Sequence, residues 1–373
     1  MKKLHVYCPY CGNEADLTLS EWRCKCGEAW EPVVQCSFDK NKIQPQNNGL
    51  WRYGEIFGLG FSEEKITLGA GWTPLLKAAY KNHEIYLKLD YLSPTGSFKD
   101  RGTEVEINVL YEMGAKKVVD DSSGNAGSSL AAYAARAGIG AEIFVPDYAS
   151  KNKKDQIAIY GARVNSIPGL RENAKKEAIE SIHQDGVVYA SHAYNPYFLL
   201  GQQSVAWEIW EQLGSQSPDW YVMPVGQGVH LLGAWMGFSR LKDAGLINKV
   251  PRMVAVQPTL LNPIVSAINQ SVDELPEIKV IKPSIAEGLA IAKPVRWKRI
   301  LEAIRKSNGI GISVEENEII NAQQELGRMG FYVEPTSATV IAALDKLWKI
   351  VKPNDIVVVG MTGTGLKGTP KFD

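Results

Sequence analysis

Strand-like and helix-like stretches alternate along most of the chain. Residues 84–91 (EIYLKLDY) alternate apolar and polar side chains, as a half-buried strand does, and residues 100–113 read as a helix that Gly114 ends. The further predicted strands are 117–121, 141–145, 187–189, 220–223, 252–256 and 356–359. The further predicted helices are 126–137, 201–213, 296–306 and 315–329. Strands that alternate with helices of this length predict an α/β fold with parallel sheets covered on both faces.

Length and composition limit the class of protein. A chain of 373 residues is long enough for two domains. Forty-one basic residues balance forty-one acidic ones without a basic cluster, so we do not expect a nucleic-acid partner. No uninterrupted apolar run approaches the length that a membrane-spanning helix needs, so no such helix is expected. The basic start, Met1 to His5, leads straight into cysteines and does not resemble a signal peptide, so a cytoplasmic location is expected.

All five cysteines lie in the first 36 residues. An odd number in a reducing compartment argues against disulfides and for a metal site or burial. Cys8 and Cys11 form a zinc-knuckle pair, and Cys24 and Cys26 supply two further ligands with one intervening residue instead of two. A structural zinc ribbon and a metal-free remnant of one both remain open. Cys36 is left over and is expected to pack as a small apolar side chain.

The loop SPTGSFKDRG, residues 93–102, follows a predicted strand and opens a predicted helix. Ser97 is the expected N-cap, which puts Lys99 in the first helical turn. A cation there opposes the helix dipole, which would depress its pKa and favour a role as an amine nucleophile or Schiff base. On its own, this loop fits an exposed surface lysine better.

Three more loops rich in Gly, Ser, Thr or Asn lie where strands end. They are SSGNAGSS (122–129), PVGQGVH (224–230) and GMTGTGLK (360–367). The first suits a carboxylate and the second a phosphate, because both precede helices. A dinucleotide motif would need glycine at position 231, which is Leu231, and no P-loop Gly-Lys-Ser/Thr follows.

Together the loops resemble the fold-type II pyridoxal-phosphate enzymes, and most of all the threonine synthases. The resemblance begins near GWTPL (71–75) and includes AEGLA (286–290) and VEPTSA (333–338). It implies two doubly wound α/β domains with the cofactor between them. A large cofactor-binding domain would comprise residues 51–102 and 191–373, and a small mobile domain residues 103–190, after a zinc-ribbon-like segment and linker at 1–50. Relatives are commonly homodimers.

The resemblance also implies a role for each residue. Lys99 would hold pyridoxal phosphate as a Schiff base and then act as general acid and base, and Asn125 would bind the cofactor's 3-hydroxyl group. Ser122, Ser123 and Ala126 would hold the carboxylate of the amino-acid substrate. Thr362 would meet the pyridine nitrogen with a neutral hydroxyl, which suits elimination and replacement chemistry. The cofactor phosphate would be bound by Gly226, Gln227, Gly228, Val229 and His230.

The implied reaction converts O-phosphohomoserine and water to threonine and phosphate. One stretch departs from the family pattern: NPYFLLGQQS (195–204) carries no cation, and Gln203 stands where lysine is expected for binding the substrate phosphate. Arg101, Lys153 or Lys154 could hold that phosphate, or the substrate is not a phosphate ester. A serine/threonine dehydratase and a β-replacement synthase acting on serine or phosphoserine therefore stay open. A non-catalytic binding protein is disfavoured, because Lys99, Asn125 and Thr362 occur together.

Overall fold

The computed structural model describes residues 4–34, 36–61, 65–149, 151–169, 171–279 and 282–368. The basic start predicted not to be a signal peptide lies partly outside these residues, because Met1 to Lys3 are not described. The chain divides into two compact units, the first comprising residues 1–71 and 93–202 and the second residues 72–92 and 203–373. The domain division expected from sequence, with boundaries at 50, 102 and 190, stays a prediction.

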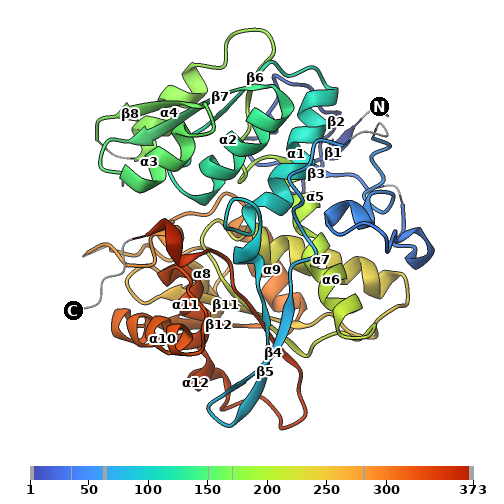
Figure 1. The fold of residues 1–373 in the computed structure, drawn as a ribbon, viewed down its shortest axis with the longest axis vertical. Coiled ribbons are helices and arrows are strands. Elements are labelled where there is room, and N and C mark those ends of the chain that lie inside the picture. Colours follow the sequence, from blue (N-terminus) through green and yellow to red (C-terminus); the bar gives the residue numbers. More distant parts are fainter. Residues whose placement is uncertain are drawn as a thin grey trace. The chain divides into compact units, whose positions relative to one another are not determined.

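The first unit contains a four-stranded parallel sheet in the order β8-β7-β6-β9, of which Figure 1 labels β8, β7 and β6. Its strands are β6 (Lys117–Asp120), β7 (Gly140–Pro146), β8 (Arg163–Ile167) and β9 (Val187–Tyr189). Its helices are α1 (Lys99–Glu112), α2 (Asn125–Ala137), α3 (Lys151–Ala158), α4 (Arg171–Glu180) and α5 (Pro196–Gln202). Helices α2 and α4 pack against β7, and α1 packs against α2 and α5.

The N-terminal segment of this unit adds a small antiparallel sheet in the order β2-β1-β3. Its strands are β1 (His5–Tyr7), β2 (Glu14–Asp16) and β3 (Glu31–Pro32). Two 3-10 helices follow, η1 (Lys40–Lys42) and η2 (Leu50–Tyr53). Between them, the polar run 44–49 forms a turn, because the backbone N–H of Gln44 donates to Arg52 O at 2.9 Å and that of Asn47 to Gln44 O at 3.0 Å.

The second unit contains a six-stranded sheet in the order β12-β11-β10-β13-β5-β4. Its strands are β4 (Leu75–Tyr80), β5 (His83–Lys88), β10 (Trp220–Pro224), β11 (Arg252–Pro258), β12 (Ile310–Val314) and β13 (Val357–Gly360). Its α-helices are α6 (Ser204–Gln212), α7 (Val229–Asp243), α8 (Pro263–Asn269), α9 (Trp297–Lys306), α10 (Glu316–Arg328), α11 (Pro335–Ala342) and α12 (Leu344–Leu347). Its 3-10 helices are η3 (Asp90–Leu92), η4 (Glu287–Leu289) and η5 (Gly365–Lys367).

The α/β class is confirmed, with two differences in detail. Strand β4 pairs antiparallel with β5, because a two-residue turn joins them and Lys81 and Asn82 both have positive φ (45° and 60°), as a type I′ hairpin requires. The helix predicted over 201–213 is divided: α5 begins at Pro196 and ends at Gln202, and α6 begins at Ser204.

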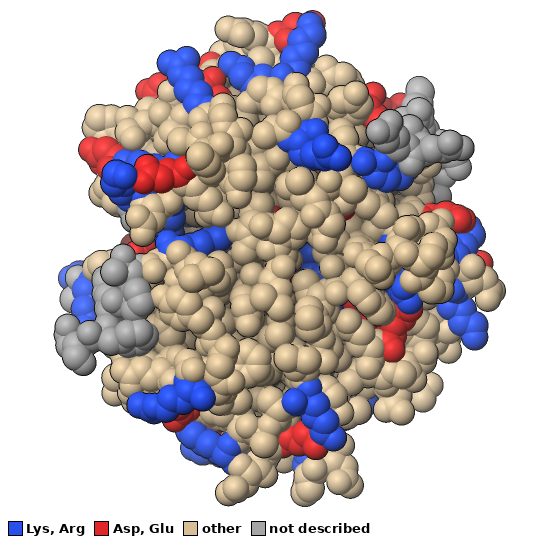
Figure 2. Space-filling model, viewed as in Figure 1, with Lys and Arg blue, Asp and Glu red and all other residues tan. Residues whose placement is uncertain are grey.

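The surface matches the balanced composition. Basic and acidic side chains are interspersed on the face shown in Figure 2, and neither sign forms a continuous stripe there. None of the helices formed by the described residues combines the length and apolar character that a membrane crossing requires. The expected absence of nucleic-acid and membrane partners stays a prediction.

Candidate active site

Lys99 is the first residue of α1, in the first unit. Its ammonium nitrogen lies 4.4 Å from the centroid of the Phe98 ring, and the side chain is half-buried. The placement of Lys99 in the first helical turn is as expected, but the expected cap is wrong. Phe98 is the N-cap residue, and the buried Ser97 hydroxyl has no hydrogen-bond partner among the described residues.

Asp100, rather than Ser97, makes the side-chain hydrogen bonds at the start of α1. One carboxylate oxygen of Asp100 accepts the backbone N–H of Thr95 at 2.7 Å, and the other accepts the Thr95 hydroxyl at 2.6 Å. The Ser129 hydroxyl of α2 lies 2.6 Å from that second oxygen. The positive end of the helix dipole also stabilises a carboxylate in the first turn. Asp100 therefore ties the loop before Lys99 to the start of α1 and to α2.

The loop 122–126 leads from β6 into α2, which begins at Asn125. Gly127 lets the helix approach this loop closely, since a Cβ there would lie 2.0 Å from Ser122 O. Ser122 and Ala126 are buried, and Ser123 is half-buried. Among the described residues, none accepts a hydrogen bond from the backbone N–H groups of Ser123 and Gly124. The loop therefore offers donors that suit a carboxylate.

The loop 226–230 lies in the second unit, where β10 ends and α7 begins. Gly228 has φ +73°, and a Cβ there would lie 2.2 Å from Ile300 Cδ1. A Cβ on Gly226 would lie 2.5 Å from Gly288 O, and Gln227 Oε1 accepts the backbone N–H of Val295 at 3.0 Å. Close packing therefore fixes the course of this loop.

The backbone N–H groups of this loop are available to a ligand. Within the described part of the chain, those of Gly226, Gln227 and Gly228 have no acceptor. They lie at the positive end of the 15-residue helix α7, which Val229 begins. His230 is buried beside the Tyr221 hydroxyl, with 2.9 Å between Tyr221 Oη and His230 Nε2. The cradle fits a phosphate group.

Thr362 follows β13 in the same unit, and its hydroxyl is oriented by Ser337 of α11. The Ser337 oxygen accepts the backbone N–H groups of Thr362 (3.0 Å) and Gly363 (2.8 Å). A hydroxyl has two acceptor lone pairs and one proton, so Ser337 can only donate to Thr362 Oγ1 at 3.0 Å or to Gly363 O at 3.2 Å. In both cases the Thr362 proton is left for another acceptor, as an unprotonated pyridine nitrogen requires.

His192 was not singled out from the sequence as a site residue. It follows β9, its ring centroid lies 5.7 Å from that of Phe198, and it is buried. Its Nδ1 has no hydrogen-bond partner among the described residues. Burial, and then the positive charges of Lys99 and Arg171, hold the pKa of His192 well below its ordinary value. The first unit thus holds a neutral imidazole in the electrostatic field of Lys99.

The stretch 195–204 is as poor in cations as expected. Phe198 is fully buried, and Gln203 accepts a hydrogen bond from Arg240 Nη1 at 3.1 Å within the second unit. Arg101, one of the cations expected to bind the substrate phosphate in place of the missing lysine, is fully buried and interacts with other groups. Lys154 donates to Asp147 O at 2.7 Å. The described contacts therefore do not mark either residue as a phosphate ligand.

The sulfurs of Cys8, Cys11, Cys24 and Cys26 all lie within 4.8 Å of one another. The Cys8–Cys26 and Cys11–Cys24 sulfur distances are both 3.5 Å, close to the value of about 3.8 Å for four sulfurs bound tetrahedrally to zinc. The short second pair is accommodated because Gly27 turns with φ 92° and donates its N–H to Cys24 O at 2.8 Å. The cluster fits a structural zinc ion.

Burial and backbone hydrogen bonds shift the pKa values of these thiols. Burial raises the pKa of Cys8 to about 12, and the backbone N–H of Asn13 lowers the pKa of Cys11 to about 7. Cys36 lies outside the cluster and contacts Ile56 O through its sulfur at 3.3 Å.

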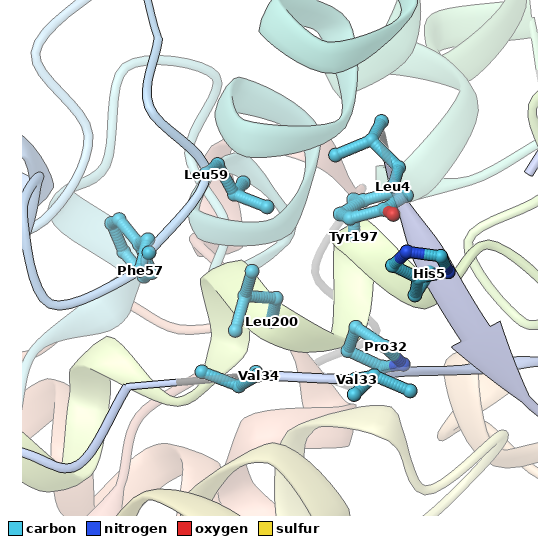
Figure 3. Close-up of a pocket in the computed structure, with 10 residues that line it drawn as sticks. Leu4, His5, Pro32, Val33, Val34, Phe57, Leu59, Tyr197 and Leu200 are labelled. Carbon is cyan, nitrogen blue, oxygen red and sulfur yellow. The ribbon is translucent and has the colours of Figure 1, made fainter. Parts of the chain in front are cut away.

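Figure 3 shows a separate pocket of about 190 Å³ between the N-terminal segment and α5. The side chains of Leu4, Val34, Phe57, Leu59 and Leu200 line it, together with the polar groups of His5 and Tyr197. None of the residues expected to bind cofactor, substrate or metal lines this pocket.

Comparisons with known proteins agree with these features. Residues 66–363 match the family model described as "Pyridoxal-phosphate dependent enzyme". A solved structure of a threonine deaminase from T.th. superposes with a TM-score of 0.67 at 22% identity, covering 81% of this chain and 93% of that one. A serine racemase structure from Dictyostelium discoideum superposes with a TM-score of 0.65 at 26% identity, covering 81% and 93%. The fold and the cradle thus define a pyridoxal-phosphate enzyme of fold type II.

Related proteins with assigned names indicate which group of this enzyme family the chain belongs to. A protein named threonine synthase from Methanocaldococcus jannaschii is 32% identical over 96% of this chain and 92% of its own length. Another of that name, from a Synechocystis species, is 36% identical over 81% of this chain and 78% of its own. This chain therefore belongs to the threonine-synthase-like group of the pyridoxal-phosphate dependent enzymes.

Proposed function

We propose that the protein is a threonine synthase that converts O-phosphohomoserine and water to threonine and inorganic phosphate. The observation that carries the proposal is the similarity to a relative of that name over 96% of the chain. The fit of the Gly226–Gly228 cradle and of Thr362 to pyridoxal phosphate supports the cofactor that this reaction requires.

The first unit would supply the proton-transfer groups. Lys99 would hold the cofactor through its amine and would move protons at the substrate's α- and β-carbons. Ser122, Ser123 and Ala126 bind the substrate carboxylate at the start of α2, and Asn125 binds the cofactor's 3-hydroxyl group. When bound, pyridoxal phosphate supplies an electron-withdrawing ring that stabilises negative charge next to the substrate's α-carbon.

The second unit would anchor the cofactor. The backbone N–H groups of the loop from Gly226 to His230 bind its phosphate, and the positive end of α7 strengthens that contact. Thr362 donates its hydroxyl proton to the ring nitrogen. A neutral hydroxyl at this position would leave that nitrogen uncharged, which suits elimination and replacement chemistry.

A second candidate is a dehydratase or β-replacement synthase acting on serine, threonine or phosphoserine. The cation-free stretch 195–204, with Phe198 buried and Gln203 bound to Arg240, favours it. A site without a cation there would lose a charge-assisted contact to a phosphate ester, worth about 1.5–3 kcal/mol.

The test compares substrates on one preparation of cofactor-loaded protein. Incubation with O-phosphohomoserine should release threonine and inorganic phosphate in equal amounts. Lys99→Ala should abolish turnover, and the exposed Lys349 provides a matched lysine control, Lys349→Ala, that should retain it. Absence of turnover on O-phosphohomoserine, with 2-oxo acid formed from serine or threonine, would instead establish the dehydratase. Cytoplasmic fractionation and light scattering would test the expected location and homodimer.

A further inference from the structure

Trp22 lies in the loop that joins the two cysteine pairs, two residues before Cys24. Its half-buried ring meets two tyrosines of the first unit edge to face. The centroid distances are 4.9 Å to Tyr189, at 76°, and 4.8 Å to Tyr194, at 89°. Aromatic pairs in this geometry contribute beyond the area they bury. The cysteine segment is thus anchored to the C-terminal end of β9 by one side chain.

Tyr189 connects Trp22 to Asp121, the residue that follows the neighbouring strand β6. Strands β9 and β6 pair in parallel, and the Tyr189 hydroxyl donates to Asp121 Oδ1 at 2.6 Å in a buried position. Burial, and then the nearby carboxylates Asp121 and Asp120, raise the pKa of Tyr189 well above its ordinary value, so the hydroxyl keeps its proton and remains a donor. Asp121 immediately precedes Ser122.

Tyr194 also contacts α4 through Lys175. Lys175 donates to the Tyr194 hydroxyl at 3.2 Å, and its ammonium nitrogen lies 4.9 Å from the Tyr194 ring centroid. Trp22 therefore packs on an aromatic pair that hydrogen bonds hold to both β6 and α4.

A bound metal would limit the freedom of Trp22. Cys11 and Cys24 bound the loop that carries Trp22, and their sulfurs lie 3.5 Å apart. Joining both to one ion closes the loop and constrains its two ends. Without the ion, the pairing of β2 with β1 and the packing of Trp22 would hold this loop.

We propose that the metal-binding segment positions the loop 121–125 through Trp22 and Tyr189, so that Trp22 is a positioning residue for the substrate carboxylate. The inference rests on the carboxylate-binding role proposed for Ser122 and Ser123. The cysteine segment lies far in sequence from the four ligand loops, so the sequence alone does not indicate this function.

Hydrogen–deuterium exchange tests the structural part without any turnover. The zinc-loaded, cofactor-loaded enzyme, the metal-stripped enzyme and Trp22→Ala are compared by peptide. Both changes should speed exchange in peptides covering 121–125 and 187–195, and leave peptides covering β11 unchanged. Trp22→Phe, which keeps an aromatic edge, should stay closer to wild type, and Glu21→Ala is the neighbouring control. Unchanged exchange at 121–125 in both altered forms would overturn the proposal.

Ligand binding tests the functional part. Titration with L-threonine, followed by the cofactor's absorbance, should give a dissociation constant about fivefold higher in Trp22→Ala, with zinc and pyridoxal phosphate contents unchanged. If the effect passes through the Tyr189 hydroxyl, the double variant with Tyr189→Phe should bind no more weakly than the weaker single variant. Additive losses, or no loss, would contradict this path even if the enzyme proves to be a dehydratase.

Discussion

Ser337 and Thr362 form one hydrogen-bonding unit in which the serine oxygen accepts two backbone N–H groups and must therefore be the donor. This order of donors leaves the Thr362 proton for another acceptor, and we propose that the acceptor is the cofactor's ring nitrogen. Ser337 stands out in the sequence only as part of the motif VEPTSA, since no spacing rule connects it with a threonine so much further along the chain.

Thr362→Val tests that donor directly, because valine keeps the shape of the side chain and removes the hydroxyl. We expect the dissociation constant of pyridoxal phosphate to rise about fivefold, as the loss of a hydrogen bond worth about 1 kcal/mol predicts. Thr362→Ser should bind the cofactor nearly as well as wild type. Absorbance titration of the cofactor-free protein measures both, and equal affinities for valine and serine would rule out the donor role.

Gly228→Ala should abolish tight cofactor binding. The added methyl group would lie 2.2 Å from Ile300 Cδ1, and the position has φ +73°, where an L-residue costs about 1–2 kcal/mol. The pyridoxal phosphate content per chain measures the effect. Adding Ile300→Ala makes space but leaves the backbone strain, so this double variant should recover part of the binding. Full cofactor content in Gly228→Ala alone would show that the loop is not the phosphate cradle.

Arg171 is our candidate for the cation that the stretch 195–204 lacks. Its Nε lies 4.0 Å from Oδ2 of Asp121, the residue before Ser122. Its positive charge contributes to the lowered pKa of His192. Arg171→Gln should raise the KM for O-phosphohomoserine about tenfold, which corresponds to a charge-assisted contact of about 1.4 kcal/mol or more. Arg163→Gln, at the start of β8, is the matched control. An unchanged KM would exclude Arg171 as a phosphate ligand.

Glu104 of α1 makes stability depend on pH. It accepts the Thr67 hydroxyl at 2.8 Å and two backbone N–H groups of the loop 68–70, yet burial raises its pKa to about 7. Between the ordinary carboxyl pKa of about 4.3 and this value, the native state binds more protons than the unfolded state, so stability falls as pH rises through that window.

Chemical unfolding of wild type and Glu104→Gln at pH 5 and pH 8 measures this contribution. Wild type should lose about 2–3 kcal/mol more than the variant between the two values, since each pKa unit corresponds to about 1.4 kcal/mol. The dependence should level off above pH 7. A constant difference between the two proteins would contradict a raised pKa at Glu104.

The sequence predicts where the loops before α2 and α7 lie, because the cues for a strand end and a helix start are local. A glycine before Val229 and a run of small residues around Asn125 need only the following helix to create donors for an anion. The strand at 187–189 agrees with β9 because it is a short β-branched and aromatic run.

Other features depend on the tertiary structure. The hydrogen bond between Tyr189 and Asp121 forms because β9 pairs with β6, a strand far earlier in the sequence, with Val119 and Tyr189 in register. The burial of His192, just after β9, depends on the same packing. Such contacts leave no periodic pattern in the chain.

The start of α1 combines local and tertiary effects. The N-cap is Phe98, with helical φ and ψ, rather than the expected Ser97, and the Asp100 carboxylate in the first turn accepts the backbone N–H of Thr95 in the preceding loop. Capping preferences of single residues do not include such a contact from within the helix.

The central claim is tested most directly by running the reaction on O-phosphohomoserine in ¹⁸O-labelled water and analysing both products by mass spectrometry. Elimination at the γ-carbon followed by addition of water at the β-carbon places one ¹⁸O atom in the threonine hydroxyl and none in the phosphate. Label in the phosphate, with homoserine as the other product, would mean hydrolysis of the ester and would contradict the proposed function.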